Sequence, residues 1–354
     1  MARLPCGIYF ETYDKERAYI RTKPQALFLA LFFIGLLFAP FLLSVRFVSM
    51  INITMITIIC IVGLQITTGY AGLLNLGQSA FMGMGAFVAS SLTVNFHLPF
   101  YLAIPAGGLG GGLMGIIFGL PAYRVKGFYL ALTTIAAQII FPILIMRMPA
   151  GILGGSMGFH LDPATFLGIS LDNEFKLYYL VMPCTVLFVG FAFNLVRTRT
   201  GRAFVAIRDN DIVAEMMGIS PLSCKTAAFF IGGSFAGVAG SLWAFYIRYV
   251  AVDQFTLWYS VWFIGMIIVG GMGNILGAIL GTVFIRSLEE MITTLGPYLS
   301  QHYPQIGGGA LWLAGMNIIL GGTIVLFLIF EPKGLVHRWK ILKASYRIWP
   351  FPYS

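Results

Sequence analysis

The chain has 354 residues, of which 58% are hydrophobic and only 10% are charged, and its mean hydropathy is +0.88. A water-soluble domain usually carries about a quarter charged residues, so this composition excludes an ordinary soluble protein and indicates a surface that largely faces lipid. The formal net charge of +9 fits contact with acidic lipid headgroups and does not require a nucleic-acid partner.

Apolar runs, taken in chain order, predict the spans, since a helix needs about 20 residues to cross a hydrocarbon core of roughly 30 Å. Six runs are nearly free of charge, at residues 26–43, 47–66, 99–120, 177–196, 226–247 and 311–330. Four others are interrupted by Gly, Pro or ionisable residues, at residues 79–95, 128–148, 255–271 and 275–292. Such breaks favour helices that face protein, because backbone at membrane depth must be hydrogen-bonded internally. The sequence therefore predicts an all-α polytopic membrane protein with about ten transmembrane helices over residues 26–330.

The distribution of Lys and Arg predicts the orientation of these spans. With cytoplasmic N- and C-termini, all but five of the 22 basic residues fall on the cytoplasmic side, which is the bias expected of such proteins. The exceptions are Arg46, Arg147, Lys176, Arg248 and Arg286. Residues 1–25 are then a cytoplasmic N-terminal segment, and residues 331–354 are a cytoplasmic C-terminal tail. The first run lacks a small-residue cleavage pattern, so it is interpreted as a retained span rather than a signal peptide.

Polar side chains gather around a glycine-rich break at residues 69–81 and in the fifth span. Polar groups inside spans are costly in lipid and normally face protein or water, which makes them candidates for a translocation path. The alternative is structural, because Ser and Thr bond to their own helix and Gln bonds to a neighbouring span. Both interpretations stay open for the whole set. The candidates are Gln65, Asn75, Gln78, Ser79, Thr133, Thr134 and Gln138.

Glycines repeat at a spacing of four residues in several spans. Gly107 and Gly111 form one such pair, and Gly233 and Gly237 form another. Because glycine lets helix backbones approach closely, this pattern predicts a tightly packed bundle. Residues 271–277 superficially resemble a dinucleotide-binding loop, but the spacing is wrong, and close helix packing is the favoured interpretation.

The cytoplasmic loop at residues 197–225 contains signals for a short helix. Asp209 or Asn210 can cap this helix, and Asp211 lies in its first turn, where the helix dipole favours negative charge. Gly218 suits the left-handed position after the last turn, and Pro221 prevents continuation. The sequence thus predicts a helix of about two turns, from residue 209 to residue 217.

This predicted helix is amphipathic. Its apolar residues lie four apart in two pairs and form one broad face. They are Ile212, Val213, Met216 and Met217. The other side carries acidic residues, whereas a helix that rests on a membrane interface carries Lys or Arg, so a protein partner is favoured. Arg202 and Arg208 lie upstream, as anchors to phosphate headgroups or to acidic residues of a partner.

Arg286, Glu289 and Glu290 are clustered charges within the ninth predicted span. Their spacing of three and four residues lets them pair on one helix. A proton- or sodium-coupled carrier would need an intramembrane acid of this kind. The cluster lies toward the outer end of its span, which favours a structural ion pair.

No enzyme or cofactor site emerges from the sequence. The chain contains no Gly-Lys pair, which a phosphate-binding loop requires. Its four histidines are isolated from one another, and its four cysteines lie far apart, without the spacing of a metal motif or a disulfide framework. The chain is therefore not expected to be an enzyme, and any energy for transport must come from another protein.

Several motifs, in order along the chain, resemble those of the permease subunits of branched-chain amino-acid ABC importers. Residues 201–219 resemble the coupling loop of that family, and residues 69–81 resemble its glycine-rich segment. Residues 154–158 resemble its external loop, residues 269–277 its late glycine turn and residues 331–335 its usual ending. Single motifs are weak, but their order and spacing together are specific and cover nearly the whole chain.

The resemblance implies a type II ABC-importer-like permease of the larger-permease type in the bacterial inner membrane. Its implied partners are two cytoplasmic ATPase subunits that bind ATP and magnesium, a second related permease subunit and a periplasmic substrate-binding protein. Branched-chain or related amino acids are the implied substrates. Urea or short amides are one alternative, and an ion-coupled secondary carrier is the other. The implied ATPase-coupling residues are Arg202, Arg208, Asp209, Asp211, Ala214, Glu215 and Gly218. Residues 154–158 are either a contact for the binding protein or only a turn.

Overall fold

The computed structural model describes residues 23–125, 127–149, 153–166, 169–302 and 309–348. Over these residues the chain is helical, apart from short connections and two small two-stranded sheets. Each of the ten predicted apolar runs coincides with a helix. These helices are α2 (Lys23–Leu42), α3 (Val45–Leu64), α4 (Gln78–Phe96), α5 (Phe100–Gly119), α6 (Phe128–Arg147), α8 (Glu174–Arg197), α11 (Pro221–Ile247), α12 (Leu257–Gly270), α13 (Ile275–His302) and α14 (Gly309–Phe330).

The protein is an all-α polytopic membrane protein. Seven described helical segments are long and apolar enough to cross a membrane, or eight if the bent pair of α14 and α15 (Leu335–Ile348) is one span. Helix α2 contributes a shorter apolar helix, and α13 carries the charged cluster near its centre. A total of ten spans stays a prediction, as does the cytoplasmic position of the termini.

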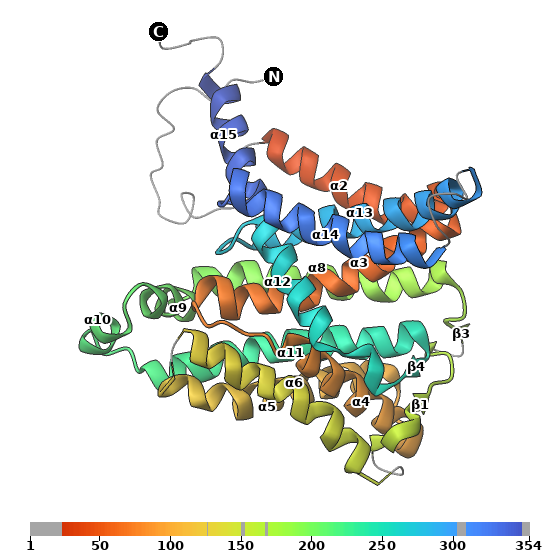
Figure 1. Ribbon diagram of the computed structural model, residues 1–354, viewed down its shortest axis with the longest axis horizontal. Helices are drawn as coiled ribbons and strands as arrows, with labels where there is room; N and C mark the ends of the chain where they lie inside the picture. Colours follow the sequence, from red (N-terminus) through yellow and green to blue (C-terminus); the bar gives the residue numbers. More distant parts are fainter. Residues whose placement is uncertain (1–22, 126, 150–152, 167–168, 303–308, 349–354) are drawn as a thin grey trace.

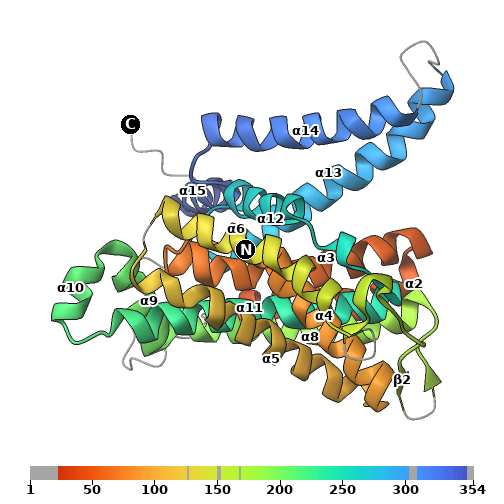
Figure 2. The same cartoon turned by 60° about the horizontal axis from the view of Figure 1, so that its bottom comes forward.

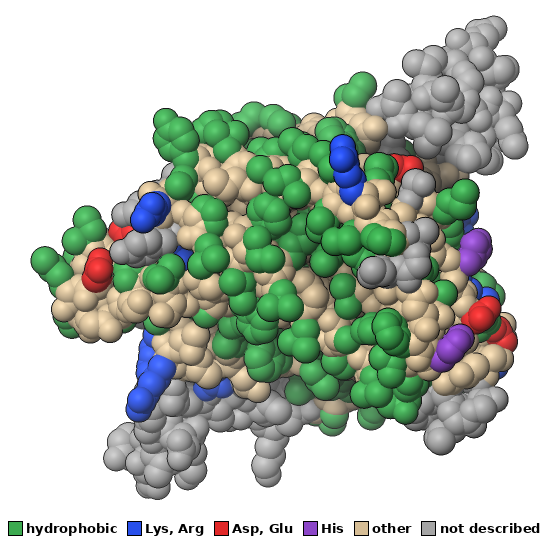
Figure 3. Space-filling model, turned by 90° about the horizontal axis from the view of Figure 1, so that it is seen from below, with side chains coloured by type: hydrophobic (Ala, Val, Ile, Leu, Met, Phe, Trp, Pro, Cys, Tyr) green, Lys and Arg blue, Asp and Glu red, His purple; other side chains and the backbone are tan. Residues whose placement is uncertain are grey.

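Helix α11 lies at the centre of the bundle and packs against α3, α4 and α5. Figures 1 and 2 show these helices as one layered body, with α13 and α14 forming a long hairpin on one side of it. Figure 3 shows apolar side chains spread over the middle of the molecule, whereas most of the coloured charged groups lie toward its two ends. This distribution is that of a membrane-embedded surface, because the hydrocarbon core accepts apolar side chains and excludes charge.

The predicted close packing through glycine is confirmed. A Cβ atom added at Gly111 would lie 2.5 Å from the carbonyl oxygen of Gly233, and one added at Gly233 would lie 2.5 Å from the oxygen of Gly111. A Cβ atom at Gly85 of α4 would collide with the backbone of Gly237. Backbones therefore touch directly at the junction of α4, α5 and α11, which no larger residue would permit.

The chain is broken between α3 and α4. Helix α3 continues into a single π-helical segment, η1 (Gln65–Tyr70), and the backbone then runs without regular structure to Gln78. Figure 1 shows this connection returning from the end near α9 into the bundle, where α4 begins. The first turn of α4 is thus surrounded by protein, and its backbone donors must find partners there.

One end of the molecule carries the small sheets. Strand β1 (Phe159–His160) pairs antiparallel with β4 (Tyr249–Val250), and β2 (Thr165–Phe166) pairs with β3 (Ile169–Ser170). The predicted external motif at residues 154–158 contains η3 (Gly155–Met157) and three glycines with positive φ. A Cβ atom at Gly158 would collide with the carbonyl oxygen of Val250, so this motif is a tight turn held against β4.

The opposite end carries the elements that the sequence predicts to be cytoplasmic. They are the 3-10 segment η2 (Leu120–Tyr123), helix α9 (Arg199–Asp209), helix α10 (Asp211–Met216) and helix α15. Figure 1 shows α10 as the element that projects furthest from the bundle at this end.

Candidate functional site

The loop at residues 197–225 folds into two helices, α9 and α10. Helix α9 was not predicted, although Phe204 and Ile207 lie three residues apart, between arginines, and both are buried. The side chain of Thr198 caps α9 by accepting a hydrogen bond from the backbone nitrogen of Gly201 at 3.4 Å. This helix is hard to predict from the sequence because the stretch is short and polar, so only the spacing of its two core residues marks it.

Helix α10 confirms the predicted short helix. The Asn210 Oδ1 atom accepts hydrogen bonds from the backbone nitrogens of Ile212 at 3.1 Å and Val213 at 3.2 Å, which satisfies two of the free donors at the helix start. Gly218 follows the helix with a φ of +83°, the left-handed conformation expected at this position. Asn210 is the cap, and Asp209 instead ends α9.

The apolar face of α10 is exposed. Side-chain exposure there is high for four residues: Ile212 62%, Val213 53%, Met216 82% and Met217 79%. Ala214 faces the opposite way and is buried, while Glu215 is exposed beside the apolar face. A compact apolar surface on an element that projects beyond the spans indicates a protein contact.

The inner side of α10 is attached to the bundle by a buried lysine. Lys225 is 3% exposed, and its Nζ atom lies 3.4 Å from the Asp211 Oδ2 atom and donates to the carbonyl oxygen of Ala122 at 3.2 Å. This lysine connects α10 to the start of α11 and the end of η2. Its role was not predicted from the sequence. The available signal was an ionisable residue just before an apolar run, which is costly to bury unless it is paired.

Arg208 makes a second attachment, to the break after α3. Its Nη1 atom donates to the carbonyl oxygen of Gly69 at 2.8 Å, and its Nε atom lies 3.5 Å from Asp209. A Cβ atom at Gly273 would lie 3.1 Å from Nη1, and one at Gly72 would lie 2.5 Å from the Arg208 Cγ atom. Both glycines have positive φ. The side chain predicted to reach outward to headgroups or a partner therefore lies between two glycine turns of its own chain.

The π-helical segment η1 is also bonded to the turn that contains Gly273. The Gln65 Nε2 atom donates to the carbonyl oxygens of Gly271 at 3.2 Å and Asn274 at 3.0 Å. Three motifs that are far apart in the sequence thus meet at one point: the π-helical end of α3, the turn between α12 and α13, and the end of α9. A cavity of about 290 Å³ opens beside this point, between the 71–73 segment, the start of α6 and the α9–α10 junction.

Polar side chains in the interior satisfy the first turn of α4. The backbone nitrogen of Leu76 donates to the Thr134 Oγ1 atom at 3.0 Å, and that of Ala80 donates to the Gln138 Oε1 atom at 2.9 Å. The backbone nitrogen of Ser79 donates to the Ser260 Oγ atom at 3.0 Å. Helices α6 and α12 therefore provide side-chain acceptors for a helix that starts inside the protein.

Asn75 and Gln78 bond to each other and to the surrounding backbone. The Asn75 Nδ2 atom donates to the Gln78 Oε1 atom at 2.8 Å, and the Asn75 Oδ1 atom accepts from the backbone nitrogen of Gly77 at 2.9 Å. The Gln78 Nε2 atom donates to the carbonyl oxygens of Cys60 at 3.0 Å and Gly232 at 3.2 Å. This pair fixes the break against α3 and α11.

The path candidates thus hold structural positions in this conformation. Six of them are buried, and Thr133 is half-buried with its hydroxyl bonded to Leu130 of its own helix. The Gln65 Oε1 atom is buried and has no hydrogen-bond partner. The role of the set in translocation stays a prediction. The six buried residues are Gln65, Asn75, Gln78, Ser79, Thr134 and Gln138.

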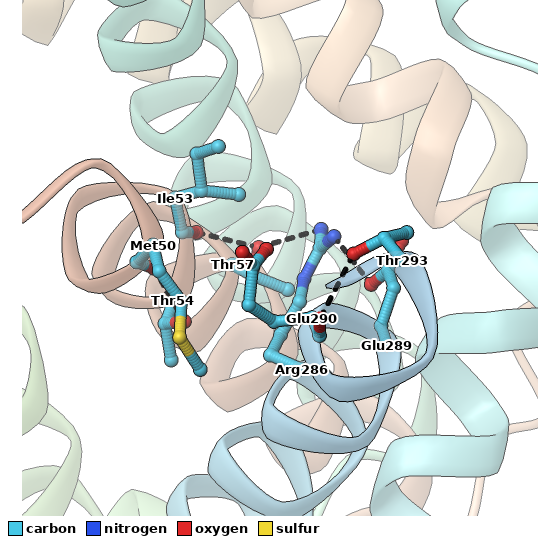
Figure 4. Close-up of polar contacts among 8 residues, drawn as sticks. All are labelled: Met50, Ile53, Thr54, Thr57, Arg286, Glu289, Glu290 and Thr293. Atoms are coloured by element: carbon cyan, nitrogen blue, oxygen red, sulfur yellow. Dashed lines mark hydrogen bonds and ion pairs between the residues drawn. The ribbon is translucent and has the colours of Figure 1, made fainter. Parts of the chain in front are cut away.

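The charged cluster on α13 is paired, as the favoured interpretation predicted. Figure 4 shows Arg286 reaching Glu289 and Thr57, and the corresponding atoms lie 2.9 Å and 3.0 Å apart. Glu290 is engaged by Arg46 at 2.7 Å. Each carboxylate therefore has a guanidinium partner, which leaves no free acid in this cluster for ion coupling.

Among the described residues, no group of three or more His, Cys, Asp and Glu residues could hold a metal ion. The chemistry offered by the loop is recognition and mechanical attachment, through an exposed apolar face on one side and two cationic side chains on the other.

Comparisons with known proteins agree with this picture. A family model described as the permease component of branched-chain amino acid transport systems matches residues 46–328. The high-affinity branched-chain amino acid transport system permease protein LivM of Salmonella typhimurium is 29% identical over 339 residues, which cover 89% of this chain and 76% of that protein. A probable LivM of Methanocaldococcus jannaschii is 27% identical over 68% of this chain and 69% of its own length. A probable LivH of the same organism is 26% identical over 79% and 89%, respectively. No solved structure matches the chain.

Proposed function

Because the chain belongs to the family of permease components of branched-chain amino acid transport systems, we propose that it is the larger permease subunit of an ABC importer in the bacterial inner membrane. Its cargo would be branched-chain or related amino acids. The observation that carries this proposal is similarity to LivM over 89% of the chain. The multi-pass helical bundle with a projecting, apolar α10 is consistent with it.

We propose the partners that this role requires. They are two cytoplasmic ATPase subunits, a second related permease subunit and a periplasmic substrate-binding protein, with the lipid bilayer around the spans. Similarity to both LivM and LivH proteins supports a membrane unit built from two related permeases. The exposed apolar face of α10 would fit a groove on one ATPase subunit. The chain itself would catalyse no covalent reaction, and ATP and magnesium would be held by the ATPases.

Two attachments would carry movement of α10 into the membrane domain. The Asp211–Lys225 pair would transmit it to α11 and η2, and Arg208 would transmit it to the break after α3 and to the turn before α13. We propose residues 26–330 as the transport domain, with residues 1–25 and 331–354 as cytoplasmic extensions and residues 197–225 as the coupling loop. No observation favours urea or short amides as the cargo, and the paired state of Glu289 and Glu290 disfavours an ion-coupled carrier.

Coupled transport provides the test. The chain would be reconstituted in vesicles with the ATPases, second permease and binding protein encoded by neighbouring genes, and ATP hydrolysis and leucine uptake would be measured together. We expect Glu215→Ala and Gly218→Pro to reduce uptake about tenfold or more while ATP hydrolysis continues, since either change alters the α10 contact. Wild-type uptake by both variants would rule out this role for α10.

Two controls separate assembly from coupling. Lys225→Met should uncouple in the same way, and Lys225→Arg should retain more uptake than Lys225→Met because it keeps a cation opposite Asp211. Vesicles that contain the chain alone should show no uptake driven by a proton or sodium gradient. Gradient-driven uptake without an ATPase would replace the importer proposal with a secondary carrier.

A further inference from the structure

Helix α15 is a feature that the transport role does not use. It follows α14 after a short turn at residues 331–334, and the two helices are bent by 50° relative to each other. The family match ends at residue 328, so α15 lies outside the matched region. Figure 1 shows α15 turned away from the line of α14 at the edge of the bundle.

Contacts at its start place α15 at the same end of the bundle as the coupling loop. A Cβ atom at Gly334 would lie 2.5 Å from the Gly271 Cα atom, and Gly334 has a φ of +74° that suits only a glycine turn. The turn that contains Gly271 continues to Gly273, which lies against Arg208. Helix α15 therefore begins at the level where the spans meet the cytoplasm.

One face of α15 is apolar and uncovered. Val336 is 4% exposed and attaches the first turn to the bundle, whereas Trp339 is 60% exposed and Leu342 is 63% exposed. Trp339 and Leu342 are three residues apart, so they lie side by side on one strip of the helix. Large apolar side chains are more stable out of water, so we expect an apolar environment to cover these two.

The charge of α15 indicates what covers this face. The sequence of Leu335–Ile348 contains no Asp or Glu. Its ionisable residues are His337, Arg338, Lys340, Lys343 and Arg347. The Arg338 guanidinium binds Glu331 at the preceding turn, and Lys340 and Lys343 are exposed. A helix with a basic polar face and an exposed Trp and Leu has the composition of an interfacial membrane helix, since the cytoplasmic leaflet is anionic.

The contrast with α10 makes the choice of partner specific. Helix α10 also exposes apolar side chains, but its charged residues are Asp211 and Glu215, which an anionic leaflet repels. It also projects beyond the bundle, whereas α15 starts beside the last span. We propose that α15 lies in the cytoplasmic headgroup layer and binds anionic phospholipid, with Trp339 and Leu342 in the acyl boundary and Lys340 and Lys343 at the phosphates.

Site-specific photocrosslinking in the full chain tests this proposal. Leu342 would be replaced with the photoreactive residue benzoylphenylalanine, and the protein would be placed in lipid nanodiscs, illuminated and analysed by mass spectrometry. Ala344 is the matched control position, because two residues further along the helix turn the side chain to the opposite face. We expect a phospholipid adduct at position 342 and at least about fivefold less at position 344.

Lipid composition tests the charge component. Raising phosphatidylglycerol from none to about 30% should increase the adduct at position 342 roughly threefold or more, since basic residues near an anionic surface are attracted to it. The double substitution Lys340→Gln and Lys343→Gln should abolish this increase. Arg199→Gln removes a basic residue from a different cytoplasmic helix and should leave the increase intact.

Other outcomes contradict the proposal. Equal adducts at positions 342 and 344, or none at either, would mean that α15 does not present this face to lipid. An adduct to an ATPase subunit in native membranes, in place of lipid, would mean that a protein covers it. Because the readout is a lipid adduct and not uptake, its failure leaves the importer proposal standing, and loss of uptake leaves this proposal standing.

Discussion

The middle of α11 and its cytoplasmic start are held by different means. In the middle, Gly233 and Gly237 bring the backbone of α11 against the backbones of α4 and α5. At the start, Lys225 reaches Ala122 and Asp211 through a long side chain, and Arg208 reaches Gly69 in the same manner. Two backbones in direct contact cannot move relative to each other without a clash. A long side chain, in contrast, can keep its hydrogen bond while the two segments that it joins shift slightly. We infer that the molecule combines a rigid centre with attachments that tolerate movement.

The largest expected effect is at the rigid centre. Gly237→Leu would force a side chain into the carbonyl oxygen of Gly107, and overpacking of this kind costs about 3 kcal/mol or more. We expect loss of folded protein, measured by the thermal transition and by gel filtration in detergent. Gly190→Leu on α8 is the control, since no atom beyond the adjoining turns of its own helix lies within 4 Å of its added Cβ. Equal stability of both variants would contradict the rigid-centre interpretation.

A slightly smaller effect is expected where polar side chains support α4. Gln138→Leu removes the acceptor for Ala80 and the donor to Phe255, and each unsatisfied buried group costs about 1–3 kcal/mol. The thermal transition should fall clearly, whereas Thr133→Val, whose hydroxyl bonds only its own helix, should change it little. If Gln138→Leu alters uptake but not stability, the residue serves the translocation path and not the fold.

The attachments should show a modest stability effect and a large functional one. Arg208→Met removes the bond to Gly69, and because this side chain is nearly half exposed the cost should be about 1 kcal/mol. Uptake by the reconstituted importer should nevertheless fall several-fold, with ATP hydrolysis retained. Arg199→Met, at the other end of α9, is the matched control. If Arg208→Met lowers uptake only as much as it lowers the amount of folded protein, Arg208 only supports the fold.

The smallest effect on stability is expected at the exposed face of α10. Ile212→Ser and Met216→Ser change side chains that contact little of the chain itself. The free energy of unfolding should therefore change by less than about 0.5 kcal/mol, and the thermal transition should barely move. Affinity for the ATPase subunit should drop, measured as the ATPase concentration that gives half-maximal uptake. Unchanged assembly would show that the ATPase binds elsewhere.

Local signals explain what could be predicted from the sequence. The positions of the helices follow from hydropathy, and α10 follows from Asn210, the acidic first turn and Gly218, all within a few residues of one another. Close helix packing was predicted because the spacing of glycine is itself local, although the contact of α5 with α11 in particular was not. These features need no knowledge of the neighbours.

Contacts between distant segments explain what could not be predicted. Arg208 and Gly69 are 139 positions apart, and Lys225 and Ala122 are 103 apart. Nothing near Arg208 indicates that its guanidinium points inward. Thr134 and Gln138 could be named as unusual polar residues, but their task as acceptors for α4 depends on which helices surround the break. Only the folded arrangement distinguishes a supporting residue from a path residue.

The supported start of α4 has a consequence for biogenesis. Its Ser79 amide pairs with Ser260, which the ribosome adds 181 residues later. At about 5–20 residues per second, roughly 9–36 seconds separate the two. During that interval the nascent chain must shelter an unfinished helix end, either beside the insertion machinery or in water. A transcript truncated before α12 should therefore yield a protein that is inserted but marked for degradation.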